Sequence, residues 1–230
     1  KIVPGHLAAL LDAAVPARVL PRRALVLGGE ALTAGLAARI AELAPACRLI
    51  NHYGPSETTV GVLTDEGGTA NAGRHALGRP LGHATVRILD AAGNPVAPGM
   101  AGEIVIGGST LAHGYVGRPG QTAERFIPDA AGRPGARVYR SGDRGRARDD
   151  GRIDFLGRLD DQVKIRGYRV EPEEVATVLR GLAGVTAATV IARADANGRL
   201  RLLAYAAGRE LDGTRLRQAL ADRLPDALVP

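Results

Sequence analysis

NHYGPSETT, residues 51–59, directly follows a short apolar segment at 48–50 that the pattern predicts as a buried strand. In open α/β sheets, ligands bind outside the carboxyl ends of the strands. The run offers an amide, a phenol, hydroxyls and a carboxylate, which are groups that a nucleoside triphosphate and its magnesium ion would use. Taken alone, it could equally be a Gly-Pro turn leading into a helix capped by Ser or Thr. The surrounding sequence separates the two interpretations.

Helices and strands alternate on the N-terminal side of this run. Apolar spacing predicts a helix near 5–14 and a strand at 24–27. A second helix is predicted from four apolar residues at helical spacing: Leu32, Leu36, Ile40 and Leu43. This alternation is typical of a parallel α/β layer.

The pattern changes twice further along the chain. Residues 74–160 contain alternating strands such as 86–89 and 103–106, separated by Gly/Pro turns, which predicts an antiparallel, β-barrel-like unit. From residue 161 a small α+β unit is expected. Its predicted elements are a strand at 162–165, a helix from Pro172, strands at 185–192 and 200–206, and a helix at 214–223. We therefore predict two domains, 1–160 and 161–230.

Composition excludes several functional classes. The chain is 45% apolar but has no run of eighteen apolar residues, so no membrane association is expected. Cys47 is the single cysteine, and no export signal opens the sequence, which predicts a cytoplasmic protein. The net charge of +6 suggests nucleic-acid binding, but the arginines are scattered and only 3% of residues are aromatic. We expect no nucleic-acid partner.

Five more segments carry chemistry, in a fixed order after the opening run: GEIVIGG at 102–108, HGY at 113–115, TAERF at 122–126, YRSGD at 139–143 and GRLDDQVKIRGYRVE at 157–171. In order and spacing they are similar to the core motifs of adenylation domains of nonribosomal peptide synthetases, within the AMP-binding, adenylate-forming superfamily. The resemblance covers essentially the whole chain. It implies the C-terminal part of the large adenylate-forming core, followed by a small mobile domain.

The resemblance implies a role for most polar groups of the opening run. Tyr53 would stack on the adenine of ATP, and Asn51 would meet its exocyclic amine. Gly54 and Ser56 would belong to the same nucleotide loop, with Ser56 standing where the family more often has threonine. Glu57 would hold Mg²⁺, which prefers one or two carboxylates plus phosphate oxygens.

Four later residues would complete the site by the same resemblance. Asp143 would accept hydrogen bonds from the ribose hydroxyls, and Arg158 would contact the ribose and phosphates. Asp160 would be the hinge of the small domain, and Gly167 would line the phosphopantetheine channel. The alternatives are a turn aspartate, a surface arginine and an ordinary turn glycine.

The resemblance also implies a side-chain pocket for the substrate, lined by Lys1, Val26, Gly28, His52, Val60 and Gly61. A buried cation without a partner is costly, and a substrate carboxylate would satisfy both Lys1 and His52. This set resembles the family's aspartate-selecting pattern. Alternatively, Lys1 is simply exposed and His52 packs beside the adenine.

The expected reaction is ATP-dependent activation of an amino acid, followed by loading onto the phosphopantetheine thiol of a peptidyl carrier domain, with a condensation domain in the parent chain. The resemblance places a phosphate loop before Lys1 and the catalytic lysine beyond Pro230, so no catalytic residue is expected within the chain. Two alternatives remain: an acyl- or aryl-acid CoA ligase of the same fold, and a non-catalytic nucleotide-binding domain.

Overall fold

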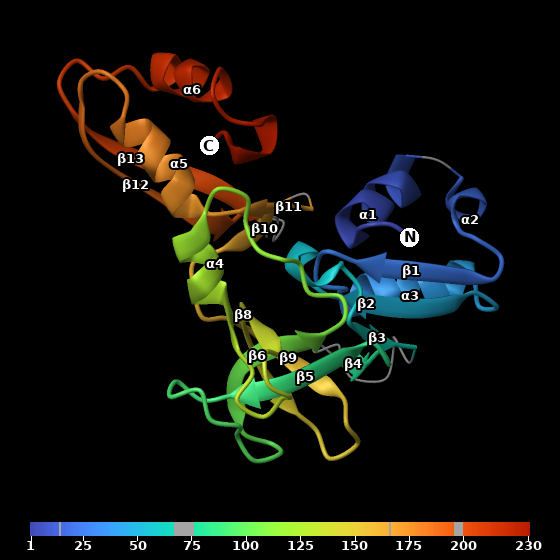
Figure 1. Cartoon of the computed structure of the whole chain (residues 1–230). Coiled ribbons are helices and arrows are strands. Elements are labelled where there is room, and N and C mark those ends of the chain that lie inside the picture. Colours follow the sequence, from blue (N-terminus) through green and yellow to red (C-terminus); the bar gives the residue numbers. More distant parts are fainter. Residues whose placement is uncertain (14, 67–75, 166, 196–199) are drawn as a thin grey trace. The chain divides into compact units, whose positions relative to one another are not determined.

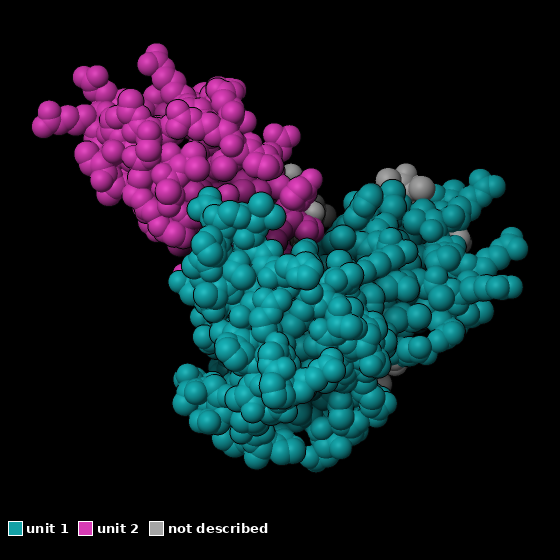
Figure 2. Space-filling model, viewed as in Figure 1, with its two compact units in different colours: residues 1–159 teal, residues 160–230 magenta. Residues whose placement is uncertain are grey.

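The computed structural model describes residues 1–230 except 14, 67–75, 166 and 196–199. The chain divides into two compact units, Lys1–Leu159 and Asp160–Pro230 (Figure 2). The division falls inside the 157–171 motif, between a leucine and an aspartate.

The first unit opens with an α/β layer, as predicted: α1 (Pro4–Ala13), α2 (Pro16–Val19), β1 (Ala24–Gly28), α3 (Ala34–Leu43) and β2 (Arg48–Tyr53) (Figure 1). β1 and β2 pair in parallel. Thr33 caps α3 by accepting the Leu36 N–H at 3.2 Å, so Leu32 precedes the helix rather than lying on its face. The core of the layer contains Leu7, Leu11, Leu25, Leu27, Leu32 and Ile40.

β2 is longer than the sequence predicted: the strand was expected to end at residue 50, with residues 51–53 in the loop after it, and that expectation was wrong. Asn51 and His52 pair with β1 on one side. On the other side, residues 51–53 pair antiparallel with β3 (Leu63–Asp65). Strand pairing on both sides satisfies the backbone N–H and C=O groups here, which favours an extended strand even where the side chains are polar. The loop therefore begins at Gly54.

The antiparallel part continues the same sheet. Its strands are β4 (Ala76–Pro80), β5 (Ala84–Leu89), β6 (Ala101–Gly108), β7 (Phe126–Pro128), β8 (Arg137–Ala147) and β9 (Ile153–Arg158). Pairing runs β1-β2-β3-β4-β9-β8-β6-β5, with β7 on β8. The parallel layer and the antiparallel unit are thus joined through β3 and β4. In the described residues this path is open, so the expected barrel-like unit is not a closed barrel. Its core contains Val62, Leu63, Ile88, Ile104, Ile106 and Ile153.

Two short helical segments complete the first unit: η1 (Ser56–Thr58), a single 3₁₀ turn directly after β2, and α4 (Pro119–Arg125), between β6 and β7. A helical turn thus follows Gly-Pro, but its N-cap residue is Pro55 and no Ser or Thr side chain caps it, so that part of the expectation was wrong.

The second unit has the predicted α+β character. Its elements are β10 (Val163–Ile165), β11 (Tyr168–Val170), α5 (Pro172–Arg180), β12 (Val185–Ala194), β13 (Leu200–Gly208), α6 (Gly213–Ala221) and η2 (Asp226–Leu228). α5 starts at Pro172 with Glu173 and Glu174 in its first turn, where the helix dipole favours carboxylates. Val175 and Leu179 bury its apolar face. No helix in the described part of either unit is long and apolar enough to cross a membrane.

Candidate functional site

Three side chains from separate motifs form one hydrogen-bonded group. Asp143 on β8 is directly opposite Arg158 on β9, and Tyr53 ends β2. The Tyr53 hydroxyl donates to Asp143 Oδ2. Arg158 Nη1 donates to Asp143 Oδ1 at 2.6 Å. Asp143 is only 8% exposed, so this is a largely buried carboxylate with two protein donors.

Two buried residues that the sequence analysis gave no role support Asp143. The Ser141 hydroxyl donates to Ile104 O at 2.6 Å and accepts the Asp143 N–H at 3.0 Å. Glu103 Oε1 accepts the Gly142 N–H at 3.0 Å. Ser141 lies in the 139–143 motif and Glu103 in the 102–108 motif, and this was the only sign in the sequence that the two residues belong to the site. A motif does not reveal which of its side chains face inward.

The electrostatics of the group keep the Tyr53 phenol protonated. Burial, followed by the charge of Asp143, raises the pKa of Tyr53 well above its usual value. A carboxylate has about four lone-pair sites, so the two oxygens of Asp143 can accept more than the two bonds they receive. The group can therefore receive ribose hydroxyls without first losing Tyr53 or Arg158.

Asn51 lies on the same β2 strand and is buried, at 7% exposure. Its Nδ2 donates to Ala76 O on β4 at 3.2 Å. This bond fixes the orientation of the amide. Recognition of an adenine amine would use the other end of the group, the acceptor Oδ1.

The carboxylate of Glu57 is also held inside the first unit. Glu57 is 9% exposed, and the Tyr115 hydroxyl donates to its Oε1 at 2.8 Å. Burial, followed by hydrogen bonds with Tyr139 and Glu57, raises the pKa of Tyr115, so the phenol remains a donor. Ser56, next to Glu57, is exposed at the start of η1.

The donor set suits one kind of cation. Among the described residues, no three His, Cys, Asp or Glu side chains gather to hold a metal by themselves. A single buried carboxylate such as Glu57 fits Mg²⁺, which takes one or two protein carboxylates and completes its shell with phosphate oxygens and water.

The loop after η1 is tight and strained. Thr59 and Val60 have φ of 60° and 69°, a left-handed conformation that is rare for β-branched residues. Gly54 is required at the entrance, because a Cβ there would lie 2.2 Å from Val60 O. The loop closes where the Val62 N–H donates to Tyr53 O at 2.9 Å. Such strain persists only where surrounding contacts enforce it, and it concentrates at functional sites.

Several proposed pocket residues gather around His52. Gly28 pairs with His52 across β1 and β2, so Val26 and Gly28 share its face of the sheet. A Cβ on Gly61 would lie 2.1 Å from His52 Cε1, so Gly61 leaves room for the imidazole. Val60 is 47% exposed on the adjoining loop.

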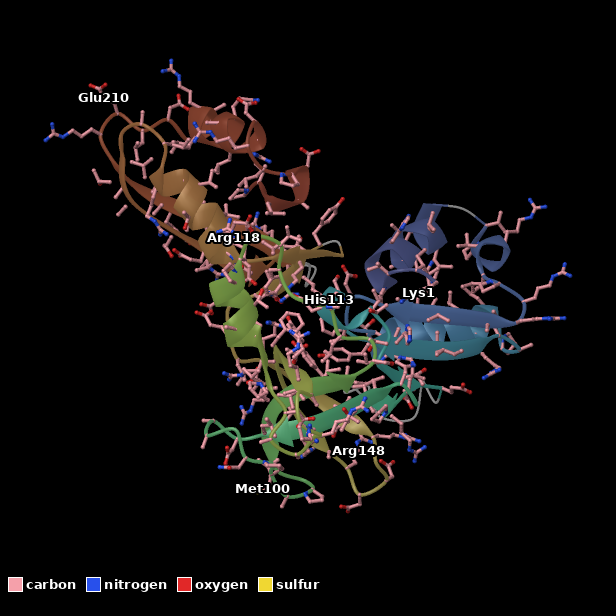
Figure 3. All side chains as sticks on the ribbon, in the orientation of Figure 1. Lys1, Met100, His113, Arg118, Arg148 and Glu210 are labelled. Atoms are coloured by element: carbon pink, nitrogen blue, oxygen red, sulfur yellow. The ribbon has the colours of Figure 1, made fainter. Side chains whose placement is uncertain are left out.

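The imidazole is electrostatically coupled to the chain's first residue. Ile2 bridges to Leu27, which places Lys1 beside β1 (Figure 3), where it is exposed. Burial, then the charges of Lys1 and His83, lower the pKa of His52. His52 Nδ1 is buried and has no hydrogen-bond partner among the described residues. An unsatisfied buried nitrogen of this kind calls for a partner.

The remaining predicted residues belong to the second unit. Asp160 is its first residue, and its Oδ1 accepts the Gln162 N–H at 3.3 Å. Gly167 has φ of +84° just before β11, so a turn requires glycine there. Arg166 of the same motif lies outside the described residues.

Comparisons with known proteins agree with these motifs. Residues 1–116 match the family described as AMP-binding enzyme. The chain is 45% identical over its whole length to a probable non-canonical nonribosomal peptide synthetase from Salinispora arenicola, of which it spans 3%.

Two solved structures share the fold at detectable identity. The first is PA1221, a nonribosomal peptide synthetase protein containing adenylation and PCP domains, with TM-score 0.80 and 29% identity over 97% of this chain and 40% of that one. The second is the Vibrio cholerae adenylation domain AlmE in complex with glycyl-adenosine-5'-phosphate, with TM-score 0.84 and 25% identity over 99% of this chain and 44% of that one. From the matched residues and these likenesses together, the chain belongs to the AMP-binding enzyme family, among the adenylation domains of nonribosomal peptide synthetases.

Proposed function

We propose that this chain forms part of an enzyme that activates an amino acid with ATP. A carboxylate oxygen of the amino acid attacks the α-phosphorus, the bond to the β-phosphate oxygen breaks, and aminoacyl-AMP and pyrophosphate result. The thiolate of a carrier-bound phosphopantetheine then attacks the acyl carbon and AMP leaves. The observation that carries this proposal is the convergence of Tyr53, Asp143 and Arg158, from three distant motifs, into one buried group.

The nucleotide roles follow from this group. Asp143 accepts the ribose hydroxyls, and Arg158, whose Nη1 already lies 2.6 Å from that carboxylate, contacts the ribose and phosphates. Tyr53 presents its ring to the adenine and Asn51 accepts from the adenine amine. These contacts hold the α-phosphate in position for in-line attack, and positioning supplies much of the acceleration in such reactions.

Glu57 is the proposed carboxylate for Mg²⁺, and Gly54 and Ser56 form the adjoining phosphate-side loop. A bound Mg²⁺ would neutralise phosphate charge during the displacement. The contribution of the chain is to hold the Glu57 carboxylate in a mostly buried position, where its interactions are stronger than in water.

We further propose aspartate as the substrate, with Lys1, Val26, Gly28, His52, Val60 and Gly61 lining its side-chain pocket. The unsatisfied Nδ1 of His52 and the influence of Lys1 on its pKa support this choice. A substrate carboxylate would accept a hydrogen bond from the imidazole and pair with the ammonium. Lys1 is exposed rather than the buried cation expected from the sequence, so the need for a partner lies with the buried His52 nitrogen.

The two-domain division at 1–160 and 161–230 remains part of the proposal. Asp160 is the proposed hinge and Gly167 the proposed lining of the phosphopantetheine channel. A peptidyl carrier domain is the acceptor, and a condensation domain belongs to the same parent protein. PA1221, which contains adenylation and PCP domains, supports the carrier assignment.

Amino-acid-dependent ATP–pyrophosphate exchange tests the proposal in a complete adenylation domain that contains this chain. Glu57→Ala and Asp143→Ala should each lower exchange about a hundredfold or more, as expected for losing a charged contact worth roughly 3 kcal/mol. Glu210→Ala, at an exposed residue of the second unit, is the control. Circular dichroism verifies that each variant is folded. Near-normal exchange in both site variants would refute the assignment.

The substrate is tested separately by exchange across a panel of amino acids. Aspartate should give the highest rate. A clear preference for an apolar or basic amino acid would refute the pocket assignment while leaving the adenylation reaction in place.

A further inference from the structure

Tyr115 belongs to the 113–115 motif, whose residues have no role in the proposed function. In the sequence it lies between His113 and Arg118, two residues that Figure 3 labels in the segment between β6 and α4. Its hydroxyl donates to Glu57 Oε1 at 2.8 Å, although 58 positions separate the two residues in the sequence. The contact therefore joins two motifs that the sequence keeps apart.

The position of Tyr115 is fixed independently of that contact. The backbone N–H of Tyr115 donates to Thr122 Oγ1 at 2.9 Å, and the Thr122 hydroxyl donates to Arg118 O at 2.9 Å. Its ring packs edge-on against Phe126, with centroids 5.7 Å apart. A Cβ on Gly114 would lie 2.4 Å from Thr122 Cγ2, so glycine permits this close approach. Contacts with α4 and β7 fix the position of Tyr115, so its hydroxyl can in turn fix the orientation of the Glu57 carboxylate.

The same segment also anchors the backbone around η1. The Ala112 N–H donates to Glu57 O at 2.8 Å, and Thr59 Oγ1 donates to Thr110 O at 2.8 Å. Both the main chain and one carboxylate oxygen of Glu57 are thus attached to residues 110–115. A ligand whose orientation is fixed beforehand loses less conformational entropy when it binds a cation.

We propose that Tyr115 is a positioning residue that orients the Glu57 carboxylate for a divalent cation through its hydrogen bond to Oε1. This inference rests on the proposed function, since it takes Glu57 to be the cation's protein carboxylate. Hydrogen-bond partners of metal ligands commonly fix ligand orientation, and losing one costs about 10–100-fold in metal affinity.

Tyr115→Phe is the direct test, because it removes the hydroxyl and keeps the ring against Phe126. Tyr205→Phe is the matched control: the same change at an exposed tyrosine on β13. Mn²⁺ binding to the full-length protein is measured by electron paramagnetic resonance at a fixed concentration of α,β-methylene-ATP. Pyrophosphate exchange with ATP is followed in parallel as Mg²⁺ is raised.

We expect Tyr115→Phe to weaken Mn²⁺ binding about tenfold or more, and to recover exchange as Mg²⁺ increases. Tyr205→Phe should match the parent in both measurements. Thr122→Val removes the acceptor of the Tyr115 N–H and leaves the phenol intact, so it should shift Mn²⁺ affinity in the same direction. It provides the test if Tyr115→Phe does not fold.

The outcomes separate this inference from the proposed function. If Glu57→Ala weakens Mn²⁺ binding while Tyr115→Phe and Thr122→Val do not, the inference is overturned and the function stands. If Glu57→Ala leaves Mn²⁺ binding unchanged, the metal assignment itself fails, and the inference fails with it. An exchange defect in Tyr115→Phe that is equal at every Mg²⁺ concentration indicates a purely structural role and also overturns the inference.

Discussion

The ion pair between Asp143 and Arg158 gives a prediction about stability that does not depend on any ligand. Asp143→Ala removes the acceptor of both the Tyr53 hydroxyl and the Arg158 guanidinium. The side chains of Arg158 and Asp143 are only 16% and 11% exposed, so Arg158 would lose this counter-charge while it stays largely buried. Losing a counter-charge at a buried position destabilises the folded state.

The magnitude follows from the geometry. Removing one partner of a buried pair costs about 3–5 kcal/mol. Arg158 keeps a hydrogen bond to Ser141 O at 3.3 Å and some contact with water, which favours the lower end, about 3 kcal/mol. At about 2–4 °C for each kcal/mol in a protein of this size, the melting temperature should fall by roughly 6–12 °C.

Thermal melting followed by circular dichroism measures this change. Asp149→Ala is the matched control, because Asp149 is exposed between the paired strands β8 and β9 and such substitutions usually stay within about 0.5 kcal/mol. The double variant Asp143→Ala/Arg158→Leu should recover part of the loss, since it also removes the buried guanidinium that has lost Asp143. If Asp143→Ala melts within about 2 °C of Asp149→Ala, the ion pair does not stabilise the folded state by the predicted amount.

Three further changes are expected to have distinct effects. Asp160→Pro should leave pyrophosphate exchange nearly intact while thioester loading collapses, because proline fixes φ at the proposed hinge; equal losses would make Asp160 merely structural. The pKa of His52 is lowered in the folded protein, so as the pH falls the unfolded chain protonates His52 before the folded protein does. The stability that neutral His52 contributes is therefore complete above about pH 6.5 and is lost as the pH falls through the lowered pKa. In denaturant titrations at several pH values, the free energy of unfolding of His52→Gln should fall less steeply with decreasing pH than that of the parent. The same pH dependence in both proteins would contradict this. Val60→Asn should raise the melting temperature by about 2–4 °C by relieving strain at φ of 69°, whereas Val116→Asn, at a fully exposed valine without positive φ, should not; equal effects would argue against strain.

Local patterns in the sequence determined the order of the elements. The helix from Pro172 was predictable because proline, two glutamates and an apolar face at helical spacing all act within one turn or two. The same is true of α3 and of strands β5 and β6, whose side-chain periodicity follows from their own backbone geometry. The order of motifs from 51 to 171 was likewise enough to recognise the family.

Contacts between distant segments could not be predicted from local sequence patterns. Residues 51–53 are a strand because β1 and β3 pair with them on both sides, and such pairing depends on segments elsewhere in the chain. The same pairing joins the two expected sheets into one open sheet through β3 and β4.

The site shows the difference most clearly. The sequence indicated Tyr53, Asp143 and Arg158 as separate members of motifs, and the resemblance assigned each a ligand. Only the tertiary structure brings Tyr53 to Asp143 across 90 positions of the chain, and Tyr115 to Glu57 across 58. Periodicity reports which face of an element is buried. Which polar groups meet inside that buried region depends on strand register and close packing, because a hydrogen bond requires its two atoms to lie within about 3 Å of each other.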